Sequence, residues 1–239
     1  MSREKVQPVV LLTVISLAAF LAIVDGTVVA LTLPAIGRDV HADIVELAWV
    51  PNAYVLTYIV LLASAGSLGD RLGRRPIFLG GIALFAAGSV VCATAGSLSW
   101  LILGRIVQGA GGAAMLTLAL AHISVAFPDR REWAMGIYVM FGSLGGVAGP
   151  LIGGAVTQLG SWRLMFWILA AIAGISLGLA WITVANSRGT RRRLDVIGLL
   201  LVGAAVLGVN VALLNAARWG WLSAPTLGAA GIGLAAGGV

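Results

Sequence analysis

Long apolar runs separated by short polar segments make up most of this chain. A helix that crosses the hydrocarbon core of a bilayer needs about 20 predominantly apolar residues. Runs of that kind lie at about 9–33, 47–69, 76–96, 98–121, 134–157, 164–185 and 196–216. Another begins near 222 and is still apolar at Val239. The pattern predicts seven membrane-spanning helices and an eighth that is cut short.

The length of these runs argues against transmembrane strands. Such strands are about ten residues long and alternate apolar with polar side chains, whereas these runs are longer and continuously apolar. Helices also satisfy their own backbone hydrogen bonds in lipid. We therefore expect an all-α polytopic membrane protein. The first run has the basic start and apolar core of a signal peptide, but no clear cleavage site precedes Asp25, so we expect an uncleaved first span.

The composition excludes several classes of function. Hydrophobic residues make up 60% of the chain and charged residues 10%, whereas soluble domains carry about a quarter charged residues. The short loops leave no room for a soluble catalytic domain, so we do not expect an enzyme. The single cysteine, Cys92, excludes an internal disulfide framework and a cysteine metal cluster. No metal site and no cofactor are expected.

The net charge of +6 does not indicate nucleic acid binding, because the basic residues lie between the apolar runs. Lysine and arginine in short loops concentrate on the cytoplasmic side of a membrane protein. A cytoplasmic amino terminus leaves only Arg38, Arg163 and Arg218 outside, whereas the inside holds Arg3, Lys5, Arg71, Arg74, Arg75, Arg130, Arg131, Arg188, Arg191, Arg192 and Arg193. We therefore expect a multi-pass protein of the cell membrane, the bacterial inner membrane in particular, with lipid around it.

A polar insert, residues 186–195, divides the chain into three parts. Residues 1–185 are expected to form a six-helix bundle, 186–195 a basic cytoplasmic linker, and 196–239 one further span with part of another. The six spans of residues 1–185 would then consist of two halves of three spans each, an arrangement that many secondary transporters use. The linker is either a solvated stop-transfer segment or a contact with anionic lipid headgroups.

The segment GSLGDRLGRRP, residues 66–76, is a charged turn between two apolar runs. Its glycines allow a compact turn, and Asp70 is an acid that positive-inside topology does not require, able to pair with a nearby arginine or a helix end. The pattern resembles the signature loop between the second and third spans of the major facilitator superfamily. That resemblance implies a cytoplasmic gate loop formed by Gly66, Asp70, Arg71, Gly73, Arg74 and Arg75.

Arg105 lies inside the fourth apolar run, where an unpaired charge near the helix centre costs about 2.5 to 3.5 kcal/mol. Asp25 is the only acid within any run, and its depth is similar to that of Arg105. We predict that the two residues face one cavity and pair. Because arginine stays charged, Asp25 is the candidate proton carrier, and the alternative is a purely structural ion pair.

Two further motifs carry the resemblance to the superfamily. Arg105, Gln108 and Gly109 match an Arg-x-x-Gln-Gly motif linked to proton transfer. The segment 24–34 is similar to the first-span motif of the drug:proton antiporters, with Ala30 where that motif usually has Asn. The resemblance implies proton coupling through Asp25 and Arg105. Thr27 and Gln108 are candidates for the lining of a cavity.

The fifth run contains glycines at the spacing of closely packed membrane helices. Its pattern resembles the fifth-span motif of the superfamily's antiporters, and the residues that match are Gly145, Gly149, Pro150, Gly153 and Gly154. The alternative is a generic glycine-rich helix that bends at its proline.

Residues 194–221 resemble the extra span of the fourteen-span EmrB/QacA-type branch. The resemblances together imply the amino-terminal portion of a proton-coupled exporter of small amphipathic or cationic drugs. Its carboxyl-terminal bundle, or a second subunit, would be a required partner, and the chain alone would not transport. Two alternatives remain: a non-transporting truncated membrane protein or interaction subunit, and an exporter of an endogenous metabolite.

Overall fold

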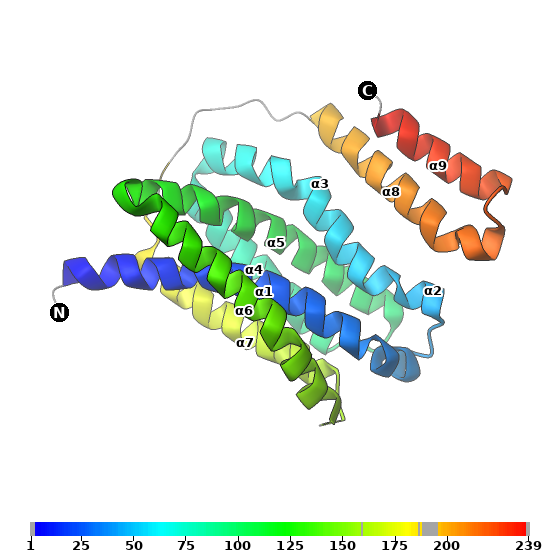
Figure 1. The fold of residues 1–239 in the computed structure, drawn as a ribbon, viewed down its shortest axis with the longest axis horizontal. Coiled ribbons are helices and arrows are strands. Elements are labelled where there is room, and N and C mark those ends of the chain that lie inside the picture. Colours follow the sequence, from blue (N-terminus) through cyan, green and yellow to red (C-terminus); the bar gives the residue numbers. More distant parts are fainter. Residues whose placement is uncertain (1–2, 159, 186, 188–195, 238–239) are drawn as a thin grey trace.

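The computed structural model describes residues 3–158, 160–185, 187 and 196–237. In these ranges the regular elements are all helices, and most of them lie roughly side by side (Figure 1). Their bounds are α1 Arg3–Val40, α2 Ile44–Leu47, α3 Trp49–Leu72, α4 Arg74–Ala93, α5 Leu98–Ala126, η1 Pro128–Arg130, α6 Arg131–Gln158, α7 Arg163–Thr183, α8 Val196–Trp219 and α9 Ala224–Gly237.

Seven helices of the described chain, α1 and α3 to α8, contain segments long and apolar enough to cross a membrane. The eighth apolar run forms α9, which has 14 residues and is shorter than a span. The expectation of an all-α polytopic membrane fold is therefore confirmed. The predicted linker, apart from Ser187, lies outside the described residues.

The first helix is longer than its apolar run predicts. α1 continues past Pro34 to Val40, where the run was expected to end near residue 33. The added residues have partners outside the helix, because Asp39 Oδ2 lies 2.6 Å from Arg163 Nη1 at the start of α7. A charge pair and the buried side chain of Ile36 thus both hold the end of α1 against the bundle.

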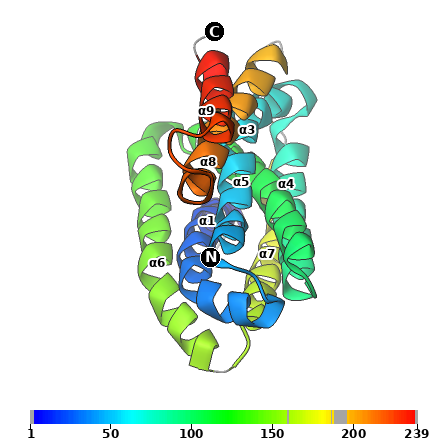
Figure 2. The ribbon, with the colours of Figure 1, turned by 90° about the vertical axis from the view of Figure 1, so that its right-hand side faces the viewer.

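Six of the helices form two interlocked triples. In one triple α1 packs against α6 and α7, and in the other α5 packs against α3 and α4. The contacts of α1 with α5 and of α4 with α7 join the two triples. Figure 2 shows α6 on one side of α1 and α4 on the opposite side of the bundle. The two triples together form one six-helix bundle.

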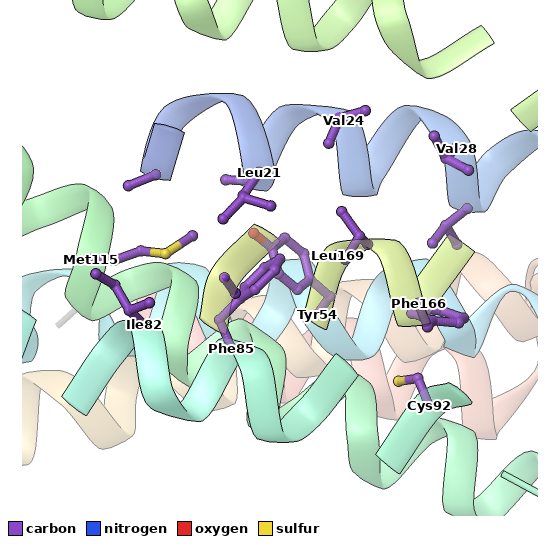
Figure 3. Packing of buried hydrophobic residues seen from close by; sticks show 14 of the residues in the cluster. Leu21, Val24, Val28, Tyr54, Ile82, Phe85, Cys92, Met115, Phe166 and Leu169 are labelled. Carbon is purple, nitrogen blue, oxygen red and sulfur yellow. The ribbon is translucent and has the colours of Figure 1, made fainter. Parts of the chain in front are cut away.

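The core combines bulky side chains with bare backbone. Figure 3 shows Leu21, Tyr54, Phe85, Met115 and Phe166, from five different helices, within one buried hydrophobic cluster. Elsewhere two helices approach so closely that only glycine fits, since a Cβ on Gly88 of α4 would lie 2.6 Å from the backbone nitrogen of Gln108 on α5.

The α8–α9 hairpin lies outside this bundle, against α3 (Figure 1). Asn210 Nδ2 of α8 donates to Asn52 Oδ1 of α3 at 3.3 Å. At the end of α8, Arg218 Nη2 lies 2.6 Å from Asp43 Oδ2, just before α2. Two polar contacts therefore attach α8 to the bundle, whereas much of its apolar surface stays exposed.

Candidate functional site

Two opposite charges meet inside the bundle, Asp25 from α1 and Arg105 from α5. Arg105 Nη1 donates to Asp25 Oδ1 at 2.7 Å and to Oδ2 at 2.6 Å. Both residues have 0% relative exposure. A buried charge is tolerated only when it is paired and hydrogen-bonded. Each residue therefore makes the position of the other possible, and the structure brings together the two residues that the sequence paired.

The guanidinium of Arg105 has further partners that hold it in one orientation. Its Nε donates to the carbonyl oxygen of Val50 on α3 at 3.1 Å, and Nη1 also donates to Gln108 Oε1 at 2.8 Å. The guanidinium carbon lies 4.6 Å from the centroid of the Tyr54 ring, a distance at which cations are attracted to aromatic faces. Arg105 is thus tied to α3 and α5 independently of Asp25.

Gln108 extends the network to α4. Its Nε2 donates to Ser89 Oγ at 2.8 Å, and Ser89 in turn donates to the carbonyl oxygen of Phe85 at 2.7 Å. The thiol of Cys92 lies 3.5 Å from Gln108 Oε1, within the distance of a weak sulfur hydrogen bond. The network therefore joins α1, α3, α4 and α5, and it fixes Gln108 so that its oxygen faces Arg105.

The chemistry available to this network is a proton exchange. Arginine remains protonated in proteins, so Asp25 is the group of the ion pair that can gain or lose a proton. Adding a proton to Asp25 removes the negative charge that balances Arg105. The network thus has an acid, a fixed cation and neutral hydrogen-bonding groups.

The structure places the two candidates for cavity lining, Thr27 and Gln108, at contacts between helices. Gln108 has no exposed surface and belongs to the buried network. The hydroxyl of Thr27 donates to the carbonyl oxygens of Ile23 and Val24 in its own helix, at 3.2 and 3.0 Å, and Thr27 packs against Gly149 of α6. Both side chains therefore serve contacts between helices in this conformation.

The charged turn between α3 and α4 contains a second ion pair. Arg74 donates to Asp70 Oδ1 from Nη2 at 3.0 Å and from Nε at 3.1 Å. Gly73 connects the two helices with φ of 107°, a conformation that residues with a Cβ rarely adopt. Of the partners considered for Asp70, the structure selects Arg74.

The remaining residues of the turn point in different directions. Gly66 and Gly69 face α5, where a Cβ would lie 3.2 Å from Thr117 Cγ2 and 2.5 Å from Leu118 Cδ2 respectively. Arg71 is exposed at the end of α3. Arg75 reaches α7 and donates from Nη2 to the carbonyl oxygen of Trp181 at 2.7 Å. The six residues of the predicted gate loop therefore do not form one cluster.

The glycine motif of α6 divides between two faces. Gly145, Gly149 and Gly153 are buried against α1, and a Cβ on Gly145 would lie 2.8 Å from the carbonyl oxygen of Phe20. Pro150 is exposed, and a Cβ on Gly154 would meet no atom within 4 Å. The buried part of the motif brings α6 close to the helix that carries Asp25.

Sequence reasoning did not find Tyr54, Ser89 and Cys92. Each lies in an apolar run, and hydropathy does not show which face of a helix meets Arg105. A weak signal was present, because Ser89 and Cys92 are three residues apart and so share one helix face. Within the described residues, no group of three or more metal-ligating side chains occurs.

Comparison with known proteins identifies relatives that are named for resistance and export. The chain is 34% identical over 220 residues to the tetracenomycin C resistance and export protein of Streptomyces glaucescens, an alignment that covers 91% of this chain and 41% of that protein. It is 35% identical over 222 residues to the multidrug resistance protein Stp of Mycobacterium tuberculosis (strain CDC 1551 / Oshkosh), covering 91% and 41%. The chain thus spans about two fifths of the length of these relatives.

Solved structures share the fold. A bacterial homologue of the human lysosomal transporter Spinster aligns with a TM-score of 0.66 and 20% identity, over 100% of this chain and 62% of that one. A peptide transporter, POT, aligns with a TM-score of 0.68 and 14% identity, over 87% and 51%. Residues 15–195, which hold the ion pair, the charged turn and the α6 glycines, match the family described as the Major Facilitator Superfamily. The chain therefore belongs to the Major Facilitator Superfamily, a family of membrane transporters rather than enzymes.

Proposed function

We propose that this chain is the amino-terminal portion of a proton-coupled transporter of the EmrB/QacA type that exports small amphipathic or cationic compounds, drugs among them, in exchange for protons. The observation that carries the proposal is the buried pair of Asp25 and Arg105. Ionisable residues within membrane-spanning helices are costly and mark ion and proton pathways. The relatives named for tetracenomycin C export and multidrug resistance supply the substrate class.

In the proposed mechanism, Asp25 carries the proton and Arg105 senses its presence. Protonation weakens the link between α1 and α5, because the carboxyl group no longer balances the guanidinium. Arg105 keeps its bonds to Val50 and Gln108 and so stays with α3 and α5. Because α1 packs against α6 and α7, a weaker link between α1 and α5 changes how the triple of α1, α6 and α7 packs against the triple of α3, α4 and α5. Protonated and unprotonated forms then favour different conformations, which is the requirement for coupling.

A second bundle is part of the proposal. Secondary transporters alternate access by rocking one helical bundle against another around a site between them. The described helices provide one six-helix bundle, and the chain spans 41% of the two relatives named above. We infer that it acts together with a carboxyl-terminal bundle or a second subunit and does not transport alone. The turn that contains Gly66, Asp70, Arg71, Gly73, Arg74 and Arg75 is the proposed gate that this partner contacts.

The proposed orientation places the amino terminus in the cytoplasm. Arg71, Arg74 and Arg75 lie at the same end of the bundle as Arg130 and Arg131, which join α5 to α6. The opposite end holds two ion pairs, in which Asp39 and Asp43 neutralise Arg163 and Arg218. Among the described loops, the first end holds these five arginines and the opposite end three, Arg38, Arg163 and Arg218. This difference supports a cytoplasmic location for the first end, in a bacterial inner membrane.

Transport by the complete protein that contains this chain tests the proposal. In proteoliposomes, addition of a cationic drug should drive proton movement in the opposite direction, and Asp25→Asn and Arg105→Ala should each reduce it strongly. Asp129→Asn is the matched control, because Asp129 is an exposed carboxylate at the end of the bundle. Normal exchange in both network variants would refute the assignment of coupling to this pair.

The chain itself allows a more direct measurement. Infrared difference spectra of the purified 239-residue chain, recorded across a pH titration, report carboxyl groups that take up a proton. We expect a band from a buried carboxyl group that disappears in Asp25→Asn and persists in Asp70→Asn. If no Asp25 band appears at any pH at which the bundle stays folded, Asp25 does not take up a proton, and its ion pair with Arg105 has a structural role only.

A further inference from the structure

The side chain of Arg75 connects two helices that are far apart in the sequence. It belongs to the first turn of α4, yet its side chain crosses to the last turn of α7. There its guanidinium carbon lies 5.4 Å from the centroid of the Trp181 ring, and Nη2 donates to the Trp181 carbonyl oxygen at 2.7 Å. Helices α4 and α7 pack against each other. Arg75 thus lies at one end of the seam between them.

Among the described residues, no carboxylate compensates the charge of Arg75. Four other arginines of the described chain each have a carboxylate within 3.0 Å, namely Arg74, Arg105, Arg163 and Arg218. No described carboxylate lies within salt-bridge distance of Arg75, and its buried Nε has no acceptor. One carbonyl oxygen and one aromatic face are its only described partners. A cation at the edge of a membrane-spanning helix pair therefore has donors left for an anion.

An apolar groove begins directly at this cation. Its volume is about 500 Å³, and it follows the seam between the two helices. Arg75 and Trp181 form its polar end, whereas Leu79, Gly80, Ala83 and Leu177 line the part that continues into the membrane. A Cβ on Gly80 would meet no atom within 4 Å, so the groove has unoccupied space at its middle. One charged end and one apolar length match the shape of a phospholipid.

We propose that this groove binds one anionic phospholipid of the leaflet that borders the start of α4. The phosphate accepts hydrogen bonds from Arg75, and an acyl chain lies between α4 and α7. Tryptophan favours the interface between headgroups and hydrocarbon. A phosphate bound to Arg75 would place Trp181 at this interface. A lipid with a net negative charge neutralises the positive charge of Arg75. A zwitterionic lipid has no net charge, so the positive charge of Arg75 remains when it binds.

A bound lipid would also strengthen the fold at a specific place. The contact of α4 with α7 is the most extensive one between the two helix triples. A lipid held by both helices adds contacts across this seam. The proposal therefore predicts stabilisation of the bundle by anionic lipid in addition to binding.

Native mass spectrometry of the purified 239-residue chain tests the site. Phosphatidylglycerol, phosphatidylcholine and soluble glycerol phosphate are titrated separately into the delipidated protein. We expect one tightly retained phosphatidylglycerol, weaker retention of phosphatidylcholine and no effect of glycerol phosphate. Arg75→Gln should weaken phosphatidylglycerol binding about fivefold, as expected for the loss of one basic contact.

Two further variants separate this site from general charge attraction. Arg131→Gln removes an equal charge from an exposed position at the same end of the bundle and should leave binding unchanged. Gly80→Leu fills the groove while keeping Arg75, and it should prevent retention of the lipid. Thermal unfolding should show that phosphatidylglycerol raises the midpoint of the parent chain and of Arg131→Gln, but not of the other two variants.

Several results would overturn the proposal. Equal weakening by Arg75→Gln and Arg131→Gln would show that the lipid responds to overall charge alone. Equal retention of both lipids would mean that the headgroup charge is not recognised. Competition by glycerol phosphate would assign the cation to a soluble phosphate, and unaltered binding in Gly80→Leu would place the acyl chain elsewhere.

Discussion

A single nitrogen of Arg105, Nη1, lies 2.7 Å and 2.6 Å from the two carboxylate oxygens of Asp25, and neither residue is exposed. The same nitrogen lies 2.8 Å from Gln108 Oε1. Three acceptor oxygens therefore converge on one end of the guanidinium, while Nε is bound separately to Val50. The carboxylate can change its charge without leaving Arg105 entirely unpartnered, which distinguishes this arrangement from an isolated buried ion pair.

Removal of both charges should destabilise the bundle by less than the sum of the two single removals. Asp25→Asn or Arg105→Gln alone leaves one buried charge uncompensated, and such changes cost about 3 to 5 kcal/mol. The double variant has no buried charge, so its loss should be smaller than the sum of the two single losses. Thermal unfolding of the four chains in one detergent measures this coupling. Additive losses would show that the two residues do not stabilise each other.

The Ser89 hydroxyl should act by positioning Gln108. Ser89→Ala removes the acceptor of Gln108 Nε2 and leaves a buried donor unsatisfied, at a cost of about 1 to 3 kcal/mol. Ser176→Ala is the matched control, because Ser176 is equally buried but donates only to its own helix, at Ile172. Unfolding midpoints should fall further for Ser89→Ala. An equal or larger loss in the control would show that the hydrogen bond between Gln108 and Ser89 adds no stability.

The helices could be predicted from the sequence because hydropathy over about 20 residues determines where a chain crosses a bilayer. Asp25 and Arg105 could also be paired, since they are the acid and the base within the runs and lie at similar depth. The partners of Arg105 on α3 and α4 could not, because Tyr54 and Ser89 are placed by the rotation of their helices. That rotation depends on packing, such as the backbone contact at Gly88.

The charged turn shows the same limit. Asp70 was expected to find an arginine, but three arginines follow it within five residues. The choice of Arg74 depends on the φ of Gly73, which turns the chain between the two helices. The destination of Arg75 depends on α7, more than 100 residues later, so local sequence carries no information about it.

Gly88 should be far less tolerant of substitution than Gly80, although both lie in α4. Gly88→Ala places a methyl group against the backbone of α5, and overpacking of this kind costs about 1 to 3 kcal/mol. Gly80→Ala meets open space and should be neutral or stabilising by about 1 kcal/mol, because alanine favours helices. Thermal unfolding compares the two. Similar midpoints would mean that α4 and α5 do not approach as closely as described.

Gly73 should be required for the ion pair that follows it. Its φ of 107° is strained for residues with a Cβ, and such backbone strain costs of order 1 to 3 kcal/mol. Gly73→Ala should therefore displace Arg74 from Asp70 as well as lower stability. If so, Asp70→Asn will have a smaller effect in the Gly73→Ala background than in the parent chain. Independent, additive effects would separate the turn from the ion pair.

The attachment of α8 should depend on the ionisation of Asp43. The carboxylate accepts hydrogen bonds from the backbone N–H groups of Glu46 and Val45, and it pairs with Arg218. The backbone N–H of Glu46, followed by the charge of Arg218, holds the pKa of Asp43 below its ordinary value of 3.8. Folding thus lowers this pKa, so the stabilisation is present above the ordinary value and is lost as pH falls through the lowered one.

The comparison of the parent chain with Asp43→Asn tests this pH dependence. The unfolding midpoint of the parent should exceed that of the variant at neutral pH, because only the parent has the charge pair. The difference should persist to mildly acidic pH and shrink only as Asp43 itself becomes protonated. Arg218→Gln should lower the unfolding midpoint less than Asp43→Ala does. In Arg218→Gln, Asp43 still accepts its two hydrogen bonds from the backbone N–H groups of Val45 and Glu46. A difference that stays constant through acid would show that Asp43 does not act through its charge.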